Sequence, residues 1–144
     1  MYKHILVPTD GSDITGKAIE SAVVLARLAG AQLTALAVKE PFPYSAISEM
    51  QPVPPQEFFD AQERIAVQNL QRVKAAAETA GITCMAVSVE ALHPWEAILD
   101  QAKTDGTDLI VMASHGRRGV SALLLGSETQ KVLTHSTIPV LVVR

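Results

Sequence analysis

The segment from Leu109 to Leu133, LIVMASHGRRGVSALLLGSETQKVL, joins an apolar run to a basic, glycine-containing loop and then to a helix start. Its first four residues are apolar at every position, which is typical of a strand buried on both faces of a parallel sheet. A strand, a glycine loop and a helix in this order form the repeating unit of α/β folds. The segment therefore predicts an α/β protein with a loop that a ligand can approach closely.

Four further apolar runs have the length of a strand: residues 4–7, 32–38, 83–89 and 140–143. Between the runs, apolar residues recur at helical spacing, as in Ala18, Ala22, Leu25 and Ala29, and in Ala66, Leu70, Val73, Ala77 and Ala80. Gly30 and Gly81 mark helix ends, and Pro55 and Pro94 mark helix starts. This alternation predicts one domain over residues 1–144, a three-layer α/β/α, Rossmann-like fold. Its five-stranded, mostly parallel sheet has the order 3-2-1-4-5.

The composition disfavours several classes of function. The 144 residues carry a net charge of −3, which disfavours a nucleic-acid partner. No apolar run approaches the ~20 residues of a membrane span, and the apolar part of the N-terminal stretch is too short for a signal peptide. We therefore expect a cytoplasmic protein with no membrane contact. Cys84 is the only cysteine, so no disulfide forms within the chain, and the four histidines are too scattered for a zinc site.

Residues 39–57 interrupt the pattern and contain five of the eight prolines. They predict an irregular loop that leaves the second strand at the ligand-binding edge of the sheet. The loop is either a lid that brings Phe42 or Tyr44 to a ligand, or a solvated linker.

The loop after the first strand resembles a phosphate-binding P-loop, because Gly11 to Ala18 fits G-x-x-x-x-G-K. Ala18 stands where that motif requires a hydroxyl for magnesium, which disfavours the match. The sequence favours instead a turn at Gly11, a helix cap at Ser12 or Asp13, and a solvated Lys17.

The loop after the fourth strand is a stronger candidate for a phosphate site. Ala113, Ser114, Gly116 and Gly119 are small enough for backbone N–H groups to approach a ligand. Gly126 and Ser127 open a helix whose free N–H groups and dipole favour an anion. The alternative is that Ser127 and Gln130 form a capping box, which would satisfy those N–H groups without a ligand.

The stretches ILVPTDGS, MASHGRRGVSALLLGS and IPVLVV resemble the universal stress protein family over nearly the whole chain. Nucleotide-binding members of that family carry G-x-x-G, nine residues, and then G followed by S or T. Here the pattern is Ala113 to Gly116, nine residues, and then Gly126 and Ser127. Ala113 replaces the first glycine. The resemblance implies an adenine nucleotide as ligand, ATP or AMP, with Mg²⁺ if the ligand is ATP.

The resemblance also implies site residues. Asp10 would reach ribose hydroxyls or a metal-bridged phosphate, although it could instead cap the first helix. Val38 would offer backbone groups to adenine. Arg117 and Arg118 could neutralise phosphate charge, or be ordinary surface arginines. His115 could contact a phosphate or serve as an acid or base, or be an ordinary loop residue. The carboxylate of Glu128 would lie beside the phosphates, with its backbone N–H facing them. The full expected set is Pro8, Thr9, Asp10, Val38, Met112, Ala113, His115, Gly116, Arg117, Gly126, Ser127, Glu128 and Thr129.

These observations predict a small adenine-nucleotide-binding protein with a regulatory role in the stress response. Slow ATP hydrolysis is a lesser alternative, because no residue set specifies an activated water. The main alternative is a nucleotide-free dimeric interaction module. In either case residues 140–143 form an apolar edge strand, which predicts a homodimer formed by pairing of this strand with its copy.

Overall fold

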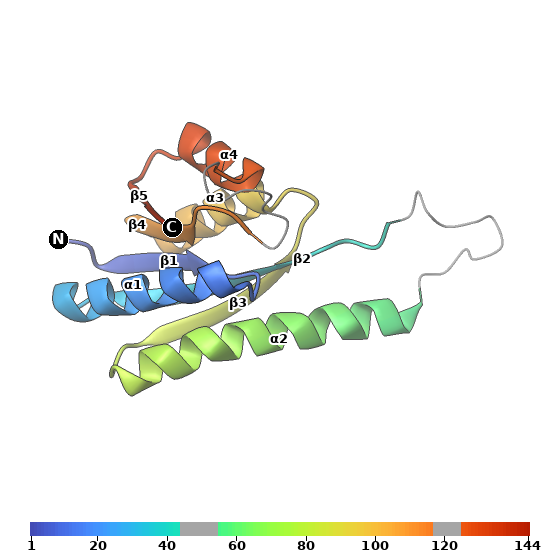
Figure 1. The fold of residues 1–144 in the computed structure, drawn as a ribbon, viewed down its shortest axis with the longest axis horizontal. Helices are drawn as coiled ribbons and strands as arrows, with labels where there is room; N and C mark the ends of the chain where they lie inside the picture. Colours follow the sequence, from blue (N-terminus) through green and yellow to red (C-terminus); the bar gives the residue numbers. More distant parts are fainter. Residues whose placement is uncertain (44–54, 117–124) are drawn as a thin grey trace.

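The computed structural model describes residues 1–43, 55–116 and 125–144. Helices and strands alternate along the chain, and Figure 1 shows them around one sheet. In chain order they are β1 (His4–Pro8), α1 (Asp13–Ala29), β2 (Gln32–Lys39), α2 (Gln56–Thr79), β3 (Cys84–Glu90), α3 (Pro94–Asp105), β4 (Leu109–Ala113), α4 (Ser127–His135) and β5 (Val140–Val143).

The sheet has the order β3-β2-β1-β4-β5, and its strands pair in parallel throughout. The predicted fold class and strand order are therefore confirmed, and every strand bound agrees with the sequence prediction to within one residue. β1 and β4 are neighbours, with Ile5 opposite Leu109 and Leu6 opposite Ile110. The chain leaves these two strands toward opposite sides of the sheet, which creates a switch point at their carboxyl ends.

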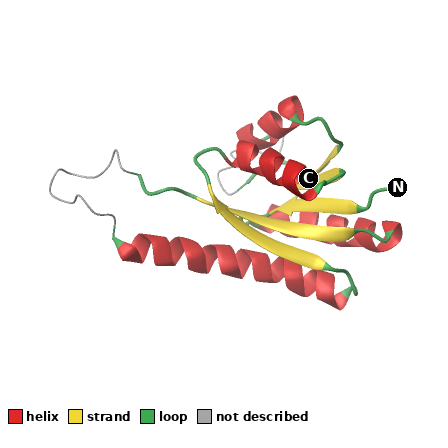
Figure 2. Ribbon diagram, turned by 180° about the vertical axis from the view of Figure 1, so that it is seen from behind, coloured by secondary structure: helices red, strands yellow, loops and turns green. Residues whose placement is uncertain are grey.

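Helices cover both faces of the sheet, as Figure 2 shows from behind. α1 and α2 bury one apolar cluster, which includes Ala22, Val73 and Val111. α3 and α4 bury a second cluster on the other face, which includes Ile98, Val132 and Met112. Because alternate residues of each central strand enter different clusters, these strands must be apolar at every position. This explains the continuous apolar runs of the sequence.

Glycine and proline residues lie at the helix ends where the sequence predicted them. Gly30 ends α1 and Gly81 follows α2, with φ angles of +67° and +71°, a conformation that favours glycine. Pro55 is the N-cap of α2, and Pro94 is the first residue of α3, where a missing N–H costs nothing.

The start of the proline-rich segment lies against α2. The ring of Phe42 packs edge-on against Phe58, with centroids 5.0 Å apart, and Lys39 pairs with Glu63 at 2.9 Å. Phe42 is thus engaged with α2, and Tyr44 lies outside the described residues. Within the described ranges, no helix is both long enough and apolar enough to cross a membrane.

Candidate functional site

The loops that follow β1 and β4 meet at the switch point. A methyl group added to Gly116 would lie only 2.6 Å from Oδ2 of Asp10. Such a distance is too short for van der Waals contact, so residue 116 must be glycine if Asp10 is to keep its position. The two loops that the sequence analysis singled out are therefore in contact.

Asp10 organises the first loop. Its Oδ1 accepts hydrogen bonds from the backbone N–H of Ser12 at 2.9 Å and from the hydroxyl of Thr15 at 2.8 Å. Ser12 occupies the N-cap position of α1, but its hydroxyl bonds Thr15 and makes no capping bond. The predicted capping role of the Ser12 side chain is therefore wrong, because Thr15 competes for its hydroxyl. Asp10 lies two residues before the N-cap and does not cap α1 itself, but its carboxylate bonds Ser12 and Thr15 at the start of this helix.

The geometry of the loop after β1 does not match a phosphate-binding P-loop. α1 already begins at Asp13, so Gly16 and Lys17 lie within the helix and not in a loop around a phosphate. Lys17 is exposed, as the sequence analysis expected. Arg72 of α2 donates a hydrogen bond to the carbonyl of Gly11 at 3.1 Å, and the side chain of Asn69 leaves no room for a Cβ at residue 11. No sequence signal pointed to these two residues, since they lie on a helix far along the chain.

The described residues on both sides of the second loop lie at the end of β4. The N–H of Gly126 donates to the carbonyl of Ser114 at 2.8 Å, and the buried hydroxyl of Thr129 donates to the carbonyl of Ala113 at 3.0 Å. A Cβ on Gly126 would lie 3.1 Å from Cα of His115, so glycine allows this close approach. The start of α4 is therefore fixed directly against the end of β4.

The first turn of α4 has no side-chain cap among the described residues. Gly126 is the N-cap residue and has no side chain to cap with, and Ser127 is the first helical residue. The Nε2 of Gln130 donates to the carbonyl of Leu125 at 2.9 Å, whereas a capping box would turn this side chain toward the N-cap N–H. The capping-box alternative is therefore wrong, because α4 already begins at Ser127, one residue too early for Ser127 to be the cap. No side chain of the described residues bonds the N–H groups of this turn, so they can bind an anion.

The Glu128 carboxylate points away from this turn. Its Oε2 accepts a hydrogen bond from the backbone N–H of Trp95, the second residue of α3, at 2.8 Å. The N–H of Glu128 belongs to the first turn of α4, as the prediction required, while the negative charge is held on a neighbouring helix. Trp95 is a contact that the sequence did not indicate.

The expected adenine-facing residue, Val38, lies just beyond the end of β1. The carbonyl of Leu36 accepts a hydrogen bond from Thr9, so it points toward β1. Backbone groups alternate sides along a strand, so those of Val38 point the same way, past Pro8, the last residue of β1. Met112 is different, because its side chain is buried in the core cluster beneath the loop.

The remaining predicted residues divide into two groups. Thr9, Ala113 and Thr129 are buried at the switch point, and the ring of His115 contacts the hydroxyl of Ser114 at 3.1 Å. Arg117 lies outside the described residues, together with Arg118 and Gly119. Among the residues that are described, no three of the histidines, cysteines and carboxylates gather into a metal site.

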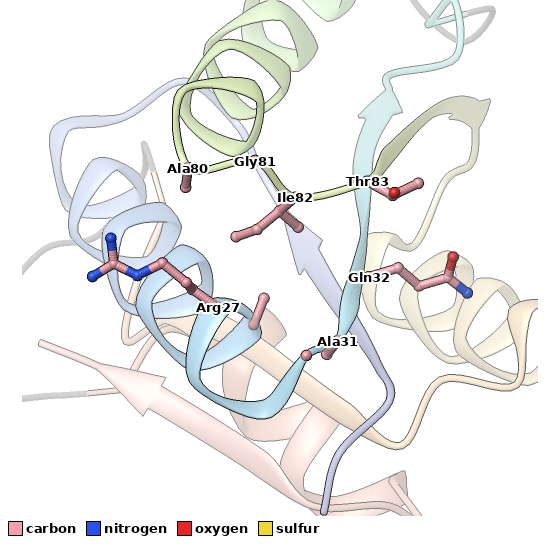
Figure 3. Close-up of a pocket in the computed structure, with 9 residues that line it drawn as sticks. Arg27, Ala31, Gln32, Ala80, Gly81, Ile82 and Thr83 are labelled. Carbon is pink, nitrogen blue, oxygen red and sulfur yellow. The ribbon is translucent and has the colours of Figure 1, made fainter.

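A separate pocket of about 270 Å³ lies at the opposite end of the sheet (Figure 3). The ends of α1 and α2 and the starts of β2 and β3 form it. Its lining residues are Ala26, Arg27, Gly30, Ala31, Gln32, Ala80, Gly81, Ile82 and Thr83. None of the predicted site residues lines this pocket, and its lining includes no acidic side chain.

Comparison with known proteins identifies the family. The model of the universal stress protein family matches residues 1–144. Universal stress protein YxiE of Bacillus subtilis is 33% identical over 150 residues, and the match covers both chains completely. The structure of universal stress protein UspA from Lactobacillus plantarum has a TM-score of 0.84 at 32% identity, and covers 99% of this chain and 98% of that one. A universal stress protein solved in complex with cAMP has a TM-score of 0.74 at 26% identity, and covers 99% of this chain and 97% of its own. The chain therefore belongs to the universal stress protein family.

Proposed function

We propose that this protein binds an adenine nucleotide, ATP or AMP, at the carboxyl ends of β1 and β4. The observation that carries the proposal is the start of α4, where no side chain caps the helix and Gly126 lets the turn lie against His115. Free N–H groups at a helix start, next to a loop of small residues, suit a phosphate group. The relative that was solved with cAMP supports an adenine nucleotide as the ligand.

The parts of the nucleotide would be divided between the two loops. The N–H groups of residues 127–129 would bind phosphate, together with Gly116 and Arg117. The Val38 backbone would meet adenine, because its peptide groups lie beyond the end of β1. Ribose or Mg²⁺ would be met by the carboxylate of Asp10, whose Oδ1 bonds the Ser12 N–H and whose Oδ2 lies next to Gly116. Mg²⁺ would accompany ATP and would add oxygen ligands from the phosphates.

The proposed output is regulatory, through a nucleotide-dependent change in shape or partner binding in the cytoplasm. His115 is the histidine nearest the proposed phosphate position, and its ring contacts the Ser114 hydroxyl. Rapid hydrolysis needs a base that activates a water, and the proposal assigns that role to no residue. Rapid hydrolysis of ATP is therefore not part of the proposal.

We further propose that the protein is a homodimer in which β5 pairs with its copy. In the described sheet, β5 has β4 as its one strand neighbour, and Leu141 at this edge is 39% exposed. Leu28 and Val24 on α1, the helix that contacts β5, are also exposed apolar residues. An apolar edge strand beside an exposed apolar helix face suits a two-fold partner.

The test of nucleotide binding combines two measurements. Mass spectrometry of the small molecules released from purified protein should detect an adenine nucleotide. Gly126→Asp should abolish binding measured by calorimetry, because a carboxylate at the start of α4 would occupy and repel the phosphate position. Gln56→Asp is the matched control, since it places the same charge at the exposed start of α2. Binding that survives Gly126→Asp in a folded protein would reject the phosphate position. Absence of binding by the wild type would favour the nucleotide-free interaction module.

A further inference from the structure

One residue of α3 contacts both ends of α4. The backbone N–H of Trp95 donates to Oε2 of Glu128 at 2.8 Å. The indole of Trp95 stacks on the ring of His135, with centroids 4.5 Å apart and planes 27° apart. Glu128 is the second residue of α4 and His135 is its last. We call these three residues the Trp95 clasp.

The hydrogen bond to Glu128 is favourable for α3 and leaves α4 uncapped. The N–H of Trp95 belongs to the first turn of α3, where N–H groups have no partner within the helix. A carboxylate suits this position, because it accepts a charge-assisted hydrogen bond at the positive end of the helix dipole. The same carboxylate is thereby drawn away from the first turn of its own helix, where it would compete with an anion.

Two other contacts of α4 lie on its inner side. Thr129 bonds the carbonyl of Ala113, which attaches α4 to the sheet, and Val132 is fully buried in the cluster that also holds Ile98 and Ala102 of α3. The clasp adds contacts with α3 at two further points, one near each end of the nine-residue helix.

We propose that the Trp95 clasp positions the first turn of α4 for phosphate, and that Glu128 is the positioning residue. This inference rests on the proposed nucleotide function. Glu128 acts through the hydrogen bond that it accepts. Its charge strengthens this bond, but an uncharged acceptor oxygen can also make it. The two properties can be separated, because glutamine keeps an acceptor oxygen at this position and removes the charge, whereas alanine removes both.

The test compares Glu128→Gln and Glu128→Ala in the full chain, with AMP and Mg-ATP as probes in calorimetry. We expect Glu128→Ala to weaken binding of AMP about tenfold and Glu128→Gln to stay within about twofold of the wild type. Glu96→Ala is the matched control. It removes an exposed carboxylate from the same turn of α3 as Trp95, and should leave binding within about twofold.

Two measurements report on the Trp95 clasp in the absence of nucleotide. The amide of Trp95 should exchange its hydrogen about tenfold faster in Glu128→Ala, and Glu128→Gln should restore the slow rate. Trp95 is the only tryptophan of the chain, so its fluorescence should change in His135→Ala, which removes the stacked ring from an exposed position.

The outcomes distinguish this inference from the proposed function. Failure of the wild type to bind either nucleotide would overturn the proposed function, and the positioning role with it. A wild type that binds, while Glu128→Ala binds equally well, would overturn the clasp alone. Tighter binding by both Glu128 variants would also overturn it, because it would mean that charge repulsion and not positioning dominates at this residue.

Discussion

Gly116→Ala should disrupt the contact between the two loops of the proposed nucleotide site. The φ angle of Gly116 is not in the left-handed region, so alanine imposes no backbone strain there. The new methyl group would lie 2.6 Å from Oδ2 of Asp10. Ordinary contact requires about 3.5 Å, so either the carboxylate or the loop must move by about 1 Å.

The expected loss of stability and affinity can be derived from the hydrogen bonds that Asp10 makes. Its Oδ1 accepts two hydrogen bonds, from the Ser12 N–H and the Thr15 hydroxyl. A hydrogen bond to a charged group contributes about 1.5–3 kcal/mol, so rotation of Asp10 would lower the free energy of unfolding by about 1–3 kcal/mol. A shift of the loop would instead move residue 116 away from phosphate. In both cases we expect the affinity for Mg-ATP to fall at least about tenfold, or about 1.4 kcal/mol.

Calorimetry with Mg-ATP and urea unfolding would be measured in parallel for this variant. Gly16→Ala is the matched control, because Gly16 lies within α1 and its new methyl group would be 3.5 Å from Arg72, an ordinary contact. The control should bind normally and gain about 0.5–1 kcal/mol of stability, since alanine favours a helix. If Gly116→Ala keeps the wild-type affinity for Mg-ATP and the wild-type free energy of unfolding, the inferred close contact between residue 116 and Asp10 would be refuted.

Three other predictions test separate parts of the molecule. Burial raises the pKa of the Cys84 thiol, so alkylation at pH 8 should be slower in the folded than in the urea-unfolded protein; equal rates would contradict the burial. Because the folded state then holds this proton more tightly, Cys84 should lower the free energy of unfolding as pH rises above the ordinary thiol pKa. Asp105→Asn should raise the free energy of unfolding at pH 8 by about 0.5–1 kcal/mol, because Oδ2 of Asp105 is buried without a hydrogen bond at the end of α3. Urea titration measures this, and a decrease would show that the 3.9 Å approach to His4 is the stronger effect. Leu141→Lys should convert a dimer to a monomer in sedimentation, because Leu141 is exposed at the β5 edge, and a monomeric wild type at tens of micromolar would remove the dimer proposal. Leu141 is chosen because Val140 and Val142 lie on the other side of the strand, where Val140 packs under α3 and α4.

The sequence could predict the sheet because burial on both faces leaves a direct record in residue type. Runs such as 109–112 are apolar throughout only if helices cover both sides of a strand. The positions of the two loops followed, because parallel strands bring their carboxyl ends to one edge. Side-chain hydrogen bonds were less predictable. Ser12 and Ser127 are both good caps by residue type, yet neither caps its helix. In the first case Thr15 competes for the hydroxyl, and in the second the helix begins one residue earlier than a capping box needs.

The start of α4 shows why residue type alone could not settle whether this helix end is open. Three consecutive side chains of its first turns can accept or donate hydrogen bonds and could by residue type bond the helix end locally. In the structure, all three bond elsewhere: Glu128 bonds Trp95 in α3, Thr129 bonds Ala113 in β4, and Gln130 bonds Leu125. Glu128 and Thr129 find partners that are distant in the sequence, and those partners exist only once the sheet and α3 have assembled. An open helix end is thus a product of tertiary contacts. Variants that disturb those contacts, such as Glu128→Ala, should affect the proposed phosphate site without altering any group that touches the phosphate.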